Sequence, residues 1–482
     1  MLVVVGGNAS FAQSPQSAVG DPATAPWPRS PYPAYGAGNG GNVPAPALQP
    51  APKRPAPRPA PVVSTPRMME TIVPVSAAVA SSEPRMVDSA LLQVQAKPLE
   101  TIAAAPSDCF SCNDSCCDDC CPPCGPPGRC WVRAEALLWW SRGSNTPPLV
   151  TQGTNPANGG ILGAPDTTVL FGGESLNEDL RLGGRITVGT WLNCRHTCGV
   201  ETYFFGTMGD QDGINAGGAG DPIVSRPFTD ATDGVQDVEL VSFPGVLAGR
   251  VDVDASSSGL LGAGALLRCN LCCGCDYRVD VIGGYRWLRF NDRVAITEDL
   301  LVLDAVFGVE PGTNIRVYDS FKAFNDFHGL ELGLDGELRS GDFFFGWLAK
   351  LAVGKNFRQV QIEGQTVVTS PAGAVAVNRG GLLTQLSNIG TYNFDEYTVI
   401  PELGVRVGYQ LGDLCRLSVG YTFIYWPGVV RAGEQIDLVV NPRLIPPVII
   451  PPAFVGPLRP AALLADSDMW IQGLNLGVEF RF

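Results

Sequence analysis

The stretch WIQGLNLGVEFRF, from Trp470 to Phe482, decides the fold. Its even-numbered positions are apolar or aromatic apart from Gln472, and its odd-numbered positions from Gly473 onward are small or polar. Strict alternation with a period of two predicts a β-strand that has one apolar and one polar face. Such a strand lies either on a protein core or in the wall of a membrane barrel, and the rest of the chain distinguishes the two.

Composition favours the membrane alternative. Only 17% of the 482 residues are charged, and the chain contains 57 Gly and 41 Pro. This is apolar for a protein of its size, yet it has no uninterrupted run of about 18 apolar residues, which a transmembrane helix would need. A membrane barrel reconciles both facts because its strands hide their hydrophobicity by alternation. The formal net charge of −14 argues against a nucleic-acid partner.

Alternating segments recur along the chain before the terminal strand. They lie at 131–141, 180–192, 198–209, 257–268, 276–290, 327–339, 343–355, 396–410 and 415–426. Each is near the length that crosses a bilayer at a tilt. We therefore predict an all-β fold, a transmembrane antiparallel up-and-down β-barrel of about ten strands. Twelve strands result if 291–326 contains a further hairpin, as Val294 and Ile296 indicate.

The connections between these segments are short and long by turns. The short links are 193–197, 269–275, 340–342 and 411–414, and the long ones are 142–179, 210–256, 291–326, 364–394 and 427–469. Outer-membrane barrels combine short periplasmic turns with long extracellular loops. The terminal strand must then close the sheet against 131–141, because a barrel in lipid cannot leave an edge unpaired. Both ends of the barrel chain fall on the short-turn side.

Cysteines gather on that same side. Of the 15 cysteines, eight lie between Cys109 and Cys130. The others, in or beside the short links, are our disulfide candidates: Cys194, Cys198, Cys269, Cys272, Cys273, Cys275 and Cys415. Disulfides are the expected use of cysteines in a secreted chain. The Cys-x-x-Cys spacings leave zinc binding as the alternative.

The region before the barrel divides into three parts. Residues 1–12 resemble the remnant of a secretory signal peptide, and 13–106 form a disordered Pro/Ala-rich periplasmic linker. A Cys-rich segment, 107–130, precedes the barrel at 131–482. The linker is either a plain spacer or an arm whose Lys53, Arg54 and Arg58 contact the anionic cell wall.

Several motifs also resemble a known family. They are WVRAEALLWW (131–140), TPPLVT (146–151), LFGGESLNEDLRLGGRITVGTWL (170–192), VDVIGGYRWLRFNDRVAITEDL (279–300), GYTFIYWPGVVRAGEQID (420–437) and the terminal strand. Together they resemble the seventh beta-barrel porin family of bacterial outer-membrane proteins over 131–482. The resemblance implies an outer-membrane barrel and brings no catalytic residues. The final aromatics, Phe480 and Phe482, resemble the signal that the barrel assembly machinery reads.

The polar faces of the strands supply the candidate functional residues. The expected lumen-lining residues are Arg133, Glu135, Arg181, Arg185, Glu201, Arg278, Asp280, Arg286, Glu331, Asp335, Glu337, Arg339, Lys350, Glu402, Arg406, Glu479 and Arg481. Ten strands are close to the size at which side chains fill the interior. We expect these residues to line a porin-like passive channel for small solutes. The alternative is a structural or adhesive envelope protein with a filled lumen, which presents long extracellular loops and a periplasmic arm.

Other functions find little support in the sequence. The chain has two histidines, His196 in a short link and His328 on the lipid-side set of its segment, and neither suits a Ser-His-Asp triad. We expect no enzyme activity, no metal and no cofactor. The expected location is the cell outer membrane, with its lipid and the assembly machinery as partners.

One long loop carries an apolar, Pro-rich run from Leu444 to Leu464. Such a run should not lie bare in water. We expect it to fold into the mouth of the barrel or to dock on a neighbouring protein.

Overall fold

The structure is a computed structural model that describes residues 128–305, 309–446 and 456–482. The expected signal remnant, the Pro/Ala-rich linker and nearly all of the Cys-rich segment lie outside the described residues, as does the middle of the 444–464 run. No helix within the described ranges is long and apolar enough to span a membrane.

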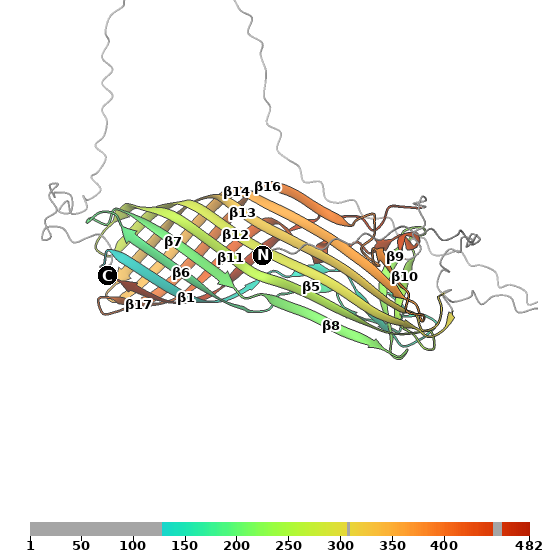
Figure 1. The fold of residues 1–482 in the computed structure, drawn as a ribbon. Coiled ribbons are helices and arrows are strands. Elements are labelled where there is room, and N and C mark those ends of the chain that lie inside the picture. The colour runs from blue at the N-terminus through green and yellow to red at the C-terminus, as the bar shows by residue number, and fades with distance from the viewer. Residues whose placement is uncertain (1–127, 306–308, 447–455) are drawn as a thin grey trace, which may run out of the picture. The chain divides into compact units, whose positions relative to one another are not determined.

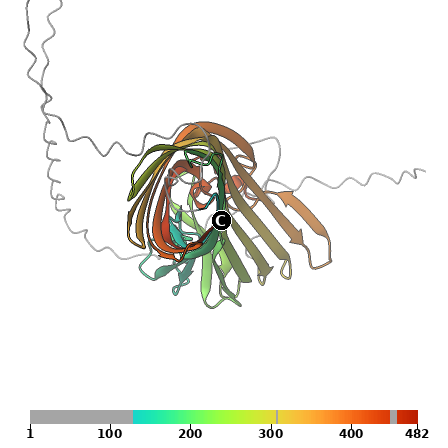
Figure 2. The ribbon, with the colours of Figure 1, turned by 90° about the vertical axis from the view of Figure 1, so that its left-hand side faces the viewer.

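Ten antiparallel strands pair side by side into a closed ring (Figures 1 and 2). In chain order they are β1 (Cys130–Ser141), β6 (Arg181–Trp191), β7 (Cys198–Thr207), β11 (Leu247–Cys273), β12 (Tyr277–Val302), β13 (Asn314–Ser340), β14 (Phe343–Thr369), β16 (Gly390–Leu411), β17 (Cys415–Val430) and β19 (Asp466–Arg481). Each one corresponds to one of the ten predicted segments. The predicted fold class is therefore confirmed.

The ring closes where the first strand meets the last. β1 pairs with β19 over eleven residues, from Trp131 opposite Arg481 to Ser141 opposite Ile471. Backbone bonds extend this seam, since Cys130 N donates to Phe482 O at 2.8 Å and Phe482 N donates to Cys130 O at 3.0 Å. The terminal alternation thus forms the closing strand, as predicted.

An apolar belt covers the outward face of the barrel over the part of its length that ends in the short turns. We call this part the membrane half. On β13 the belt contains Leu330 and Leu332, which are 74% and 65% exposed. On β16 it contains Leu403, Val405 and Val407, all exposed. The intervening residues point inward and are buried or half-buried. Large apolar side chains so widely exposed need a lipid environment, and the four short turns of the ring lie at the end of this half.

Beyond the belt, the outward-facing residues are polar and the inward-facing residues are apolar. We call this part of the barrel the loop half. On β11, Arg250 and Asp252 are exposed whereas Val251 and Val253 are buried. The strands β11 to β14 are 26 or 27 residues long, more than twice what a bilayer requires. They therefore continue past the membrane as a barrel with a water-facing exterior and an apolar interior.

This extension corrects two predictions. The stretch 291–326 does not add two strands to the ring, because it lengthens β12 and β13 instead. The stretch 210–256 is not mainly loop: it contains β8 (Asp210–Gly218), β9 (Ile223–Asp230), β10 (Gln236–Ser242) and the beginning of β11. The prediction of membrane strands assumed that the apolar residues face outward. It therefore missed strands whose apolar residues face inward.

A small second sheet fills the loop half, at the end opposite the C-terminus in Figure 1. We call it the plug. It consists of β3 (Val150–Gly153), β4 (Thr167–Phe171), β9, β10 and β18 (Val439–Val440). Its Val224, Phe228 and Val241 share one buried apolar cluster with Ile296 and Phe321 of the wall. Each such buried side chain contributes roughly 1.5–3 kcal/mol, so the cluster holds the plug strongly in place.

Short elements complete the loop half. They are β2 (Ser144–Thr146), β5 (Glu174–Leu176), β15 (Val375–Arg379) and the 3₁₀ turns η3 (Gly433–Gln435) and η4 (Pro442–Leu444). Leu444 is buried, and Ile445 and Ala462 pack against the apolar cluster. Leu458 and Leu463 remain exposed. The described ends of the 444–464 run therefore belong partly to the filling of the barrel mouth.

Candidate functional site

The inward face of the membrane half carries the expected lumen-lining residues. The structure places all seventeen on the inward phase of the ring strands. Arg181 lies apart from the others, because it donates to Ser257 Oγ at 2.7 Å and lies 3.6 Å from Asp210. The remaining charges pair within strands, between neighbouring strands and across the bore. Two further cations, Arg268 and Arg416, complete their pairing.

The first level of this network lies in the middle of the membrane half. Arg286 Nη1 lies 3.0 Å from Glu331 Oε1 and 2.7 Å from Glu402 Oε2. Lys350 Nζ contacts the same two carboxylates at 2.8 and 3.2 Å. Tyr203 of β7 donates its hydroxyl to Glu331 Oε2 of β13 at 2.7 Å. Because β7 and β13 are not neighbours in the ring, this bond crosses the bore.

A second level lies closer to the short turns. Arg268 of β11 lies 3.0 Å from Asp335 of β13, 3.1 Å from Asp280 and 3.2 Å from Glu201 of β7. Arg406 of β16 contacts Asp335 from the other side at 3.1 Å. One carboxylate thus joins cations from two opposed parts of the wall.

The third level lies at the seam, near the rim. Glu479 of β19 accepts from Arg133 Nε at 2.7 Å and from Arg481 Nε at 2.5 Å. Arg416 of β17 lies 3.4 Å from Glu479 and 2.9 Å from Glu337. Sequence reasoning missed Arg268 and Arg416. Both lie on the inward phase of predicted strands, so the same alternation would have found them.

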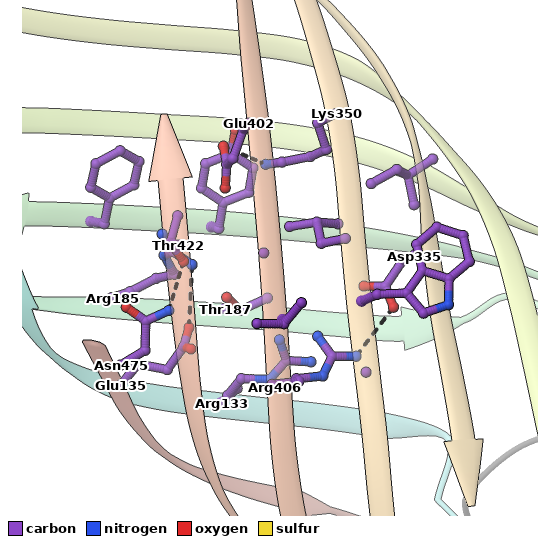
Figure 3. A pocket seen from close by; sticks show the side chains of 18 of the residues that line it. Arg133, Glu135, Arg185, Thr187, Asp335, Lys350, Glu402, Arg406, Thr422 and Asn475 are labelled. Carbon is purple, nitrogen blue, oxygen red and sulfur yellow. Dashed lines mark hydrogen bonds and ion pairs between the residues drawn. The ribbon is translucent and has the colours of Figure 1, made fainter. Parts of the chain in front are cut away.

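Little space remains between these side chains. Figure 3 shows Arg133, Arg406, Lys350 and Glu402 pointing into a cavity of about 60 Å³. A second cavity of about 20 Å³ lies between Arg268, Asp335 and Arg481. At roughly 10–15 Å³ per water centre, the first cavity has room for about four to six water molecules and the second for one or two. The interior of the membrane half is therefore packed with paired charges.

A comparable set of buried ion pairs holds the plug in the loop half. Arg226 of β9 is 1% exposed and donates through Nη2 to Asp319 of β13 at 2.8 Å. Its Nη1 pairs with Glu298 of β12 and lies 3.8 Å from Glu239 of β10. Burial raises the pKa of Glu239 well above its ordinary value, and the neighbouring charge of Glu298 raises it further. The central strand of the plug is thereby joined to two strands of the wall.

The rim of the short turns carries the cysteines of the folded part. Cys198 of β7 is paired in register with Cys269 of β11, and their Sγ atoms are 2.8 Å apart. Cys273 takes part in a disulfide bond. Cys194 and Cys275 are exposed in the neighbouring turns, and Cys415 begins β17. The described cysteines thus share one end of the barrel.

The two histidines lie in a short turn and on the outward face of the barrel. His196 stacks on Trp191 with ring centroids 5.7 Å apart in the turn between β6 and β7. His328 lies on the outward face, where its Nδ1 is 2.5 Å from the Tyr285 hydroxyl. The backbone carbonyl of His196 accepts from Arg278 Nη2 at 2.7 Å, so this turn adjoins the inward charges at the rim.

Comparison with protein families matches residues 131–482 to the family described as putative beta barrel porin-7. The chain belongs to this family. The match begins and ends with the barrel, so the seam of β1 and β19 joins the two limits of the family region. No curated protein matches the chain.

The comparison with solved structures gives likenesses of low score, three of which are outer-membrane proteins or transporters. The outer membrane protease OmpT from Escherichia coli has 12% identity and a TM-score of 0.34, over 74% of this chain and 97% of its own. A FadL homologue from Pseudomonas aeruginosa has 6% identity and a TM-score of 0.23, over 74% and 90%. The toluene transporter TodX from Pseudomonas putida has 7% identity and a TM-score of 0.14, over 74% and 90%.

Proposed function

We propose that this protein is an outer-membrane barrel whose bore is closed, and that it anchors a rigid, plugged extension at the cell surface. The observation that carries the proposal is the bridging of the bore at three levels by buried ion pairs, with the plug beyond them. Of the two functions that the sequence left open, this geometry favours the structural one. The loop half would then be the part presented to the exterior.

The energetics of buried charges support a closed bore. The side chains of Arg286 and Glu331 are fully buried, and those of Lys350 and Glu402 are nearly so. Separating such a pair leaves an uncompensated buried charge, at a cost of about 3–5 kcal/mol. A solute crossing the bore would have to break several pairs at successive levels, and the plug would still lie ahead of it.

The location and partners follow from the same surfaces. The apolar belt fits the hydrocarbon of the outer membrane, and the closing strand β19 fits recognition by the barrel assembly machinery. We propose a non-enzymatic role, because the charged groups of the bore are already paired with one another.

Membership of a porin family favours a second candidate, a passive channel for small solutes. In that case the plug must leave the loop half and the bridges must open during transport. The mixed signs of the inward charges would give such a channel little preference for anions or cations.

Solute flux separates the two functions. Proteoliposomes that contain the folded full chain should not swell in isosmotic glycine or arabinose above the rate of protein-free vesicles. Swelling that increases with protein content would instead support the channel. A sample that shifts in gel mobility on boiling verifies that the reconstituted barrel is folded.

A further inference from the structure

Four neighbouring strands form a regular grid of side chains on the outward face, just above the apolar belt. The strands are β12, β13, β14 and β16, and pairing in register aligns their residues in rows. One row reads Arg289, Asp326, Phe357 and Asp395. The next row, farther from the belt, reads Asn291, Phe324, Gln359 and Asn393. These eight residues, together with Arg358 and Phe394, line a shallow groove of about 710 Å³.

The groove lies at the level where lipid headgroups are expected. The row below it contains Trp287, His328, Lys355 and Tyr397, and the next row down contains Tyr285, Leu330, Val353 and Val399. Aromatic side chains of this kind mark the boundary between hydrocarbon and water. A lipid whose acyl chains lie along Leu330 and Val353 would therefore place its headgroup in the groove.

The charges of the groove are already balanced. Arg289 Nη2 lies 2.5 Å from Asp326 Oδ2, and Trp287 Nε1 donates to Asp326 Oδ1 at 2.6 Å. Lys355 pairs with Asp395. Arg358, which also lines the groove, pairs with Glu396 and Asp466. A phosphate would meet the carboxylates of the groove, and the cations around it are committed to carboxylates. The arrangement thus disfavours an anionic headgroup.

The remaining side chains suit hydroxyl groups and sugar rings. Gln359 Nε2 donates to Asn393 Oδ1 at 2.7 Å, and amides both donate and accept as hydroxyls do. Phe357 is 47% exposed and Phe324 is half-buried, so two aromatic rings are accessible beside these amides. Four strands span roughly 14 Å, which accommodates about two sugar rings. The volume also lies within the usual range of ligand sites.

We propose that this groove binds the neutral saccharide headgroup of a glycolipid in the outer leaflet. Phe357 would pack on the apolar face of a sugar ring, and Gln359 and Asn393 would bond with its hydroxyls. The proposal rests on the transmembrane fold and is independent of whether the bore conducts.

Lipid retention tests this proposal. The full chain is transferred into a detergent without a sugar headgroup and mixed with glucosyl diacylglycerol, phosphatidylethanolamine and phosphatidylglycerol of identical acyl chains. Native mass spectrometry then counts the lipids that remain bound. The glucosyl lipid should be retained about fivefold more than either phospholipid, the size expected when one aromatic contact and its neighbours contribute.

Matched variants locate the effect. Phe357→Ala and Gln359→Ala should remove the preference for the glucosyl lipid, whereas Phe343→Ala should keep it. Phe343 is an outward, exposed aromatic at the opposite end of the same strand. Equal retention of all three lipids by the wild-type chain would overturn the proposal, and so would strongest retention of phosphatidylglycerol. An equal loss in Phe343→Ala would show that the groove is not the site.

Discussion

Arg226 of the plug and Asp319 of the wall form a buried ion pair in which Nη2 and Oδ2 are 2.8 Å apart. Asp319 also accepts from the backbone N–H and the hydroxyl of Thr384, so the carboxylate is held in place from a second direction. Arg226 in turn contacts Glu298 and Glu239. One guanidinium therefore links β9 to β10, β12 and β13. It adds to the apolar cluster in holding the plug in place.

Replacing Arg226 should loosen the plug. Arg226→Met leaves three carboxylates in an apolar interior without their cation, which should destabilise the loop half by about 3–5 kcal/mol. Hydrogen exchange of the β9 and β10 amides should accelerate accordingly, while the amides of the membrane half stay protected. Arg250→Met is the control, because Arg250 is exposed on the outward face of β11. Equal hydrogen-exchange rates of the β9 and β10 amides in Arg226→Met and Arg250→Met would show that Arg226 does not hold the plug.

The same cluster predicts a pH dependence. Burial raises the pKa of Glu239 and of Glu298 above their ordinary values. Because the folded pKa exceeds the unfolded one, the stabilisation is complete below the ordinary glutamate pKa and is lost as pH rises through the folded pKa. Unfolding of the loop half should therefore become easier as pH increases.

Glu239→Gln provides the test of that sign. An amide cannot lose the proton, so the variant should show a weaker pH dependence of the denaturant midpoint for the loop half. Asp252→Asn, at an exposed position of β11, should leave the dependence unchanged. A steeper dependence in Glu239→Gln would contradict the assignment.

At the rim, we expect Cys198 and Cys269 to be joined by a disulfide bond in the mature protein. Their Sγ atoms are 2.8 Å apart on paired strands, so oxidation by a periplasmic dithiol–disulfide exchange enzyme needs little movement. Trypsin cleaves after Arg195 and Arg268 but not between Arg226 and Pro227, which places Cys198 in the peptide 196–250 and Cys269 in 269–278.

Alkylation of the free thiols before reduction, followed by analysis of the tryptic peptides, detects this disulfide bond. The two peptides should be recovered linked, and Cys269→Ser should expose Cys198 to alkylation. Cys275→Ser, in the adjacent turn, should leave Cys198 protected. Full alkylation of Cys198 in the unreduced wild-type protein would refute the pairing.

Removal of the final residue tests the closing strand. Phe482 is exposed on the lipid-facing phase, and its backbone makes two bonds with Cys130 at the seam. Deleting it should lower the yield of heat-modifiable barrel in the membrane well below that of Phe343→Ala, an outward aromatic at the same rim. Equal yields would mean that the terminal aromatic has no special part in assembly.

The sequence was sufficient to predict the ring and the inward charges. Period-two alternation fixes both faces of a membrane strand, so the ten strands and the closing pair of β1 and β19 could be predicted directly. The pairing of these charges could not be predicted from the sequence. Whether Arg286 and Glu331 line water or meet across the bore depends on the tilt and register of strands that are distant in the chain.

The loop half was harder to predict for a physical reason. There the interior is apolar and the exterior is wet, so residues such as Val251 and Val253 follow the pattern of a soluble barrel rather than a membrane strand. The plug is also built from short strands whose pairing is non-local: β3 pairs with β9, and β9 with β18. Alternation over two to eight residues does not identify such partners.

Single-channel recording tests the closed bore most directly. The folded full chain, reconstituted into a planar bilayer at high protein load in 1 M KCl, should give no discrete conductance steps, because three levels of ion pairs and the plug obstruct the bore. Regular steps of one size, increasing in number with added protein, would contradict the account.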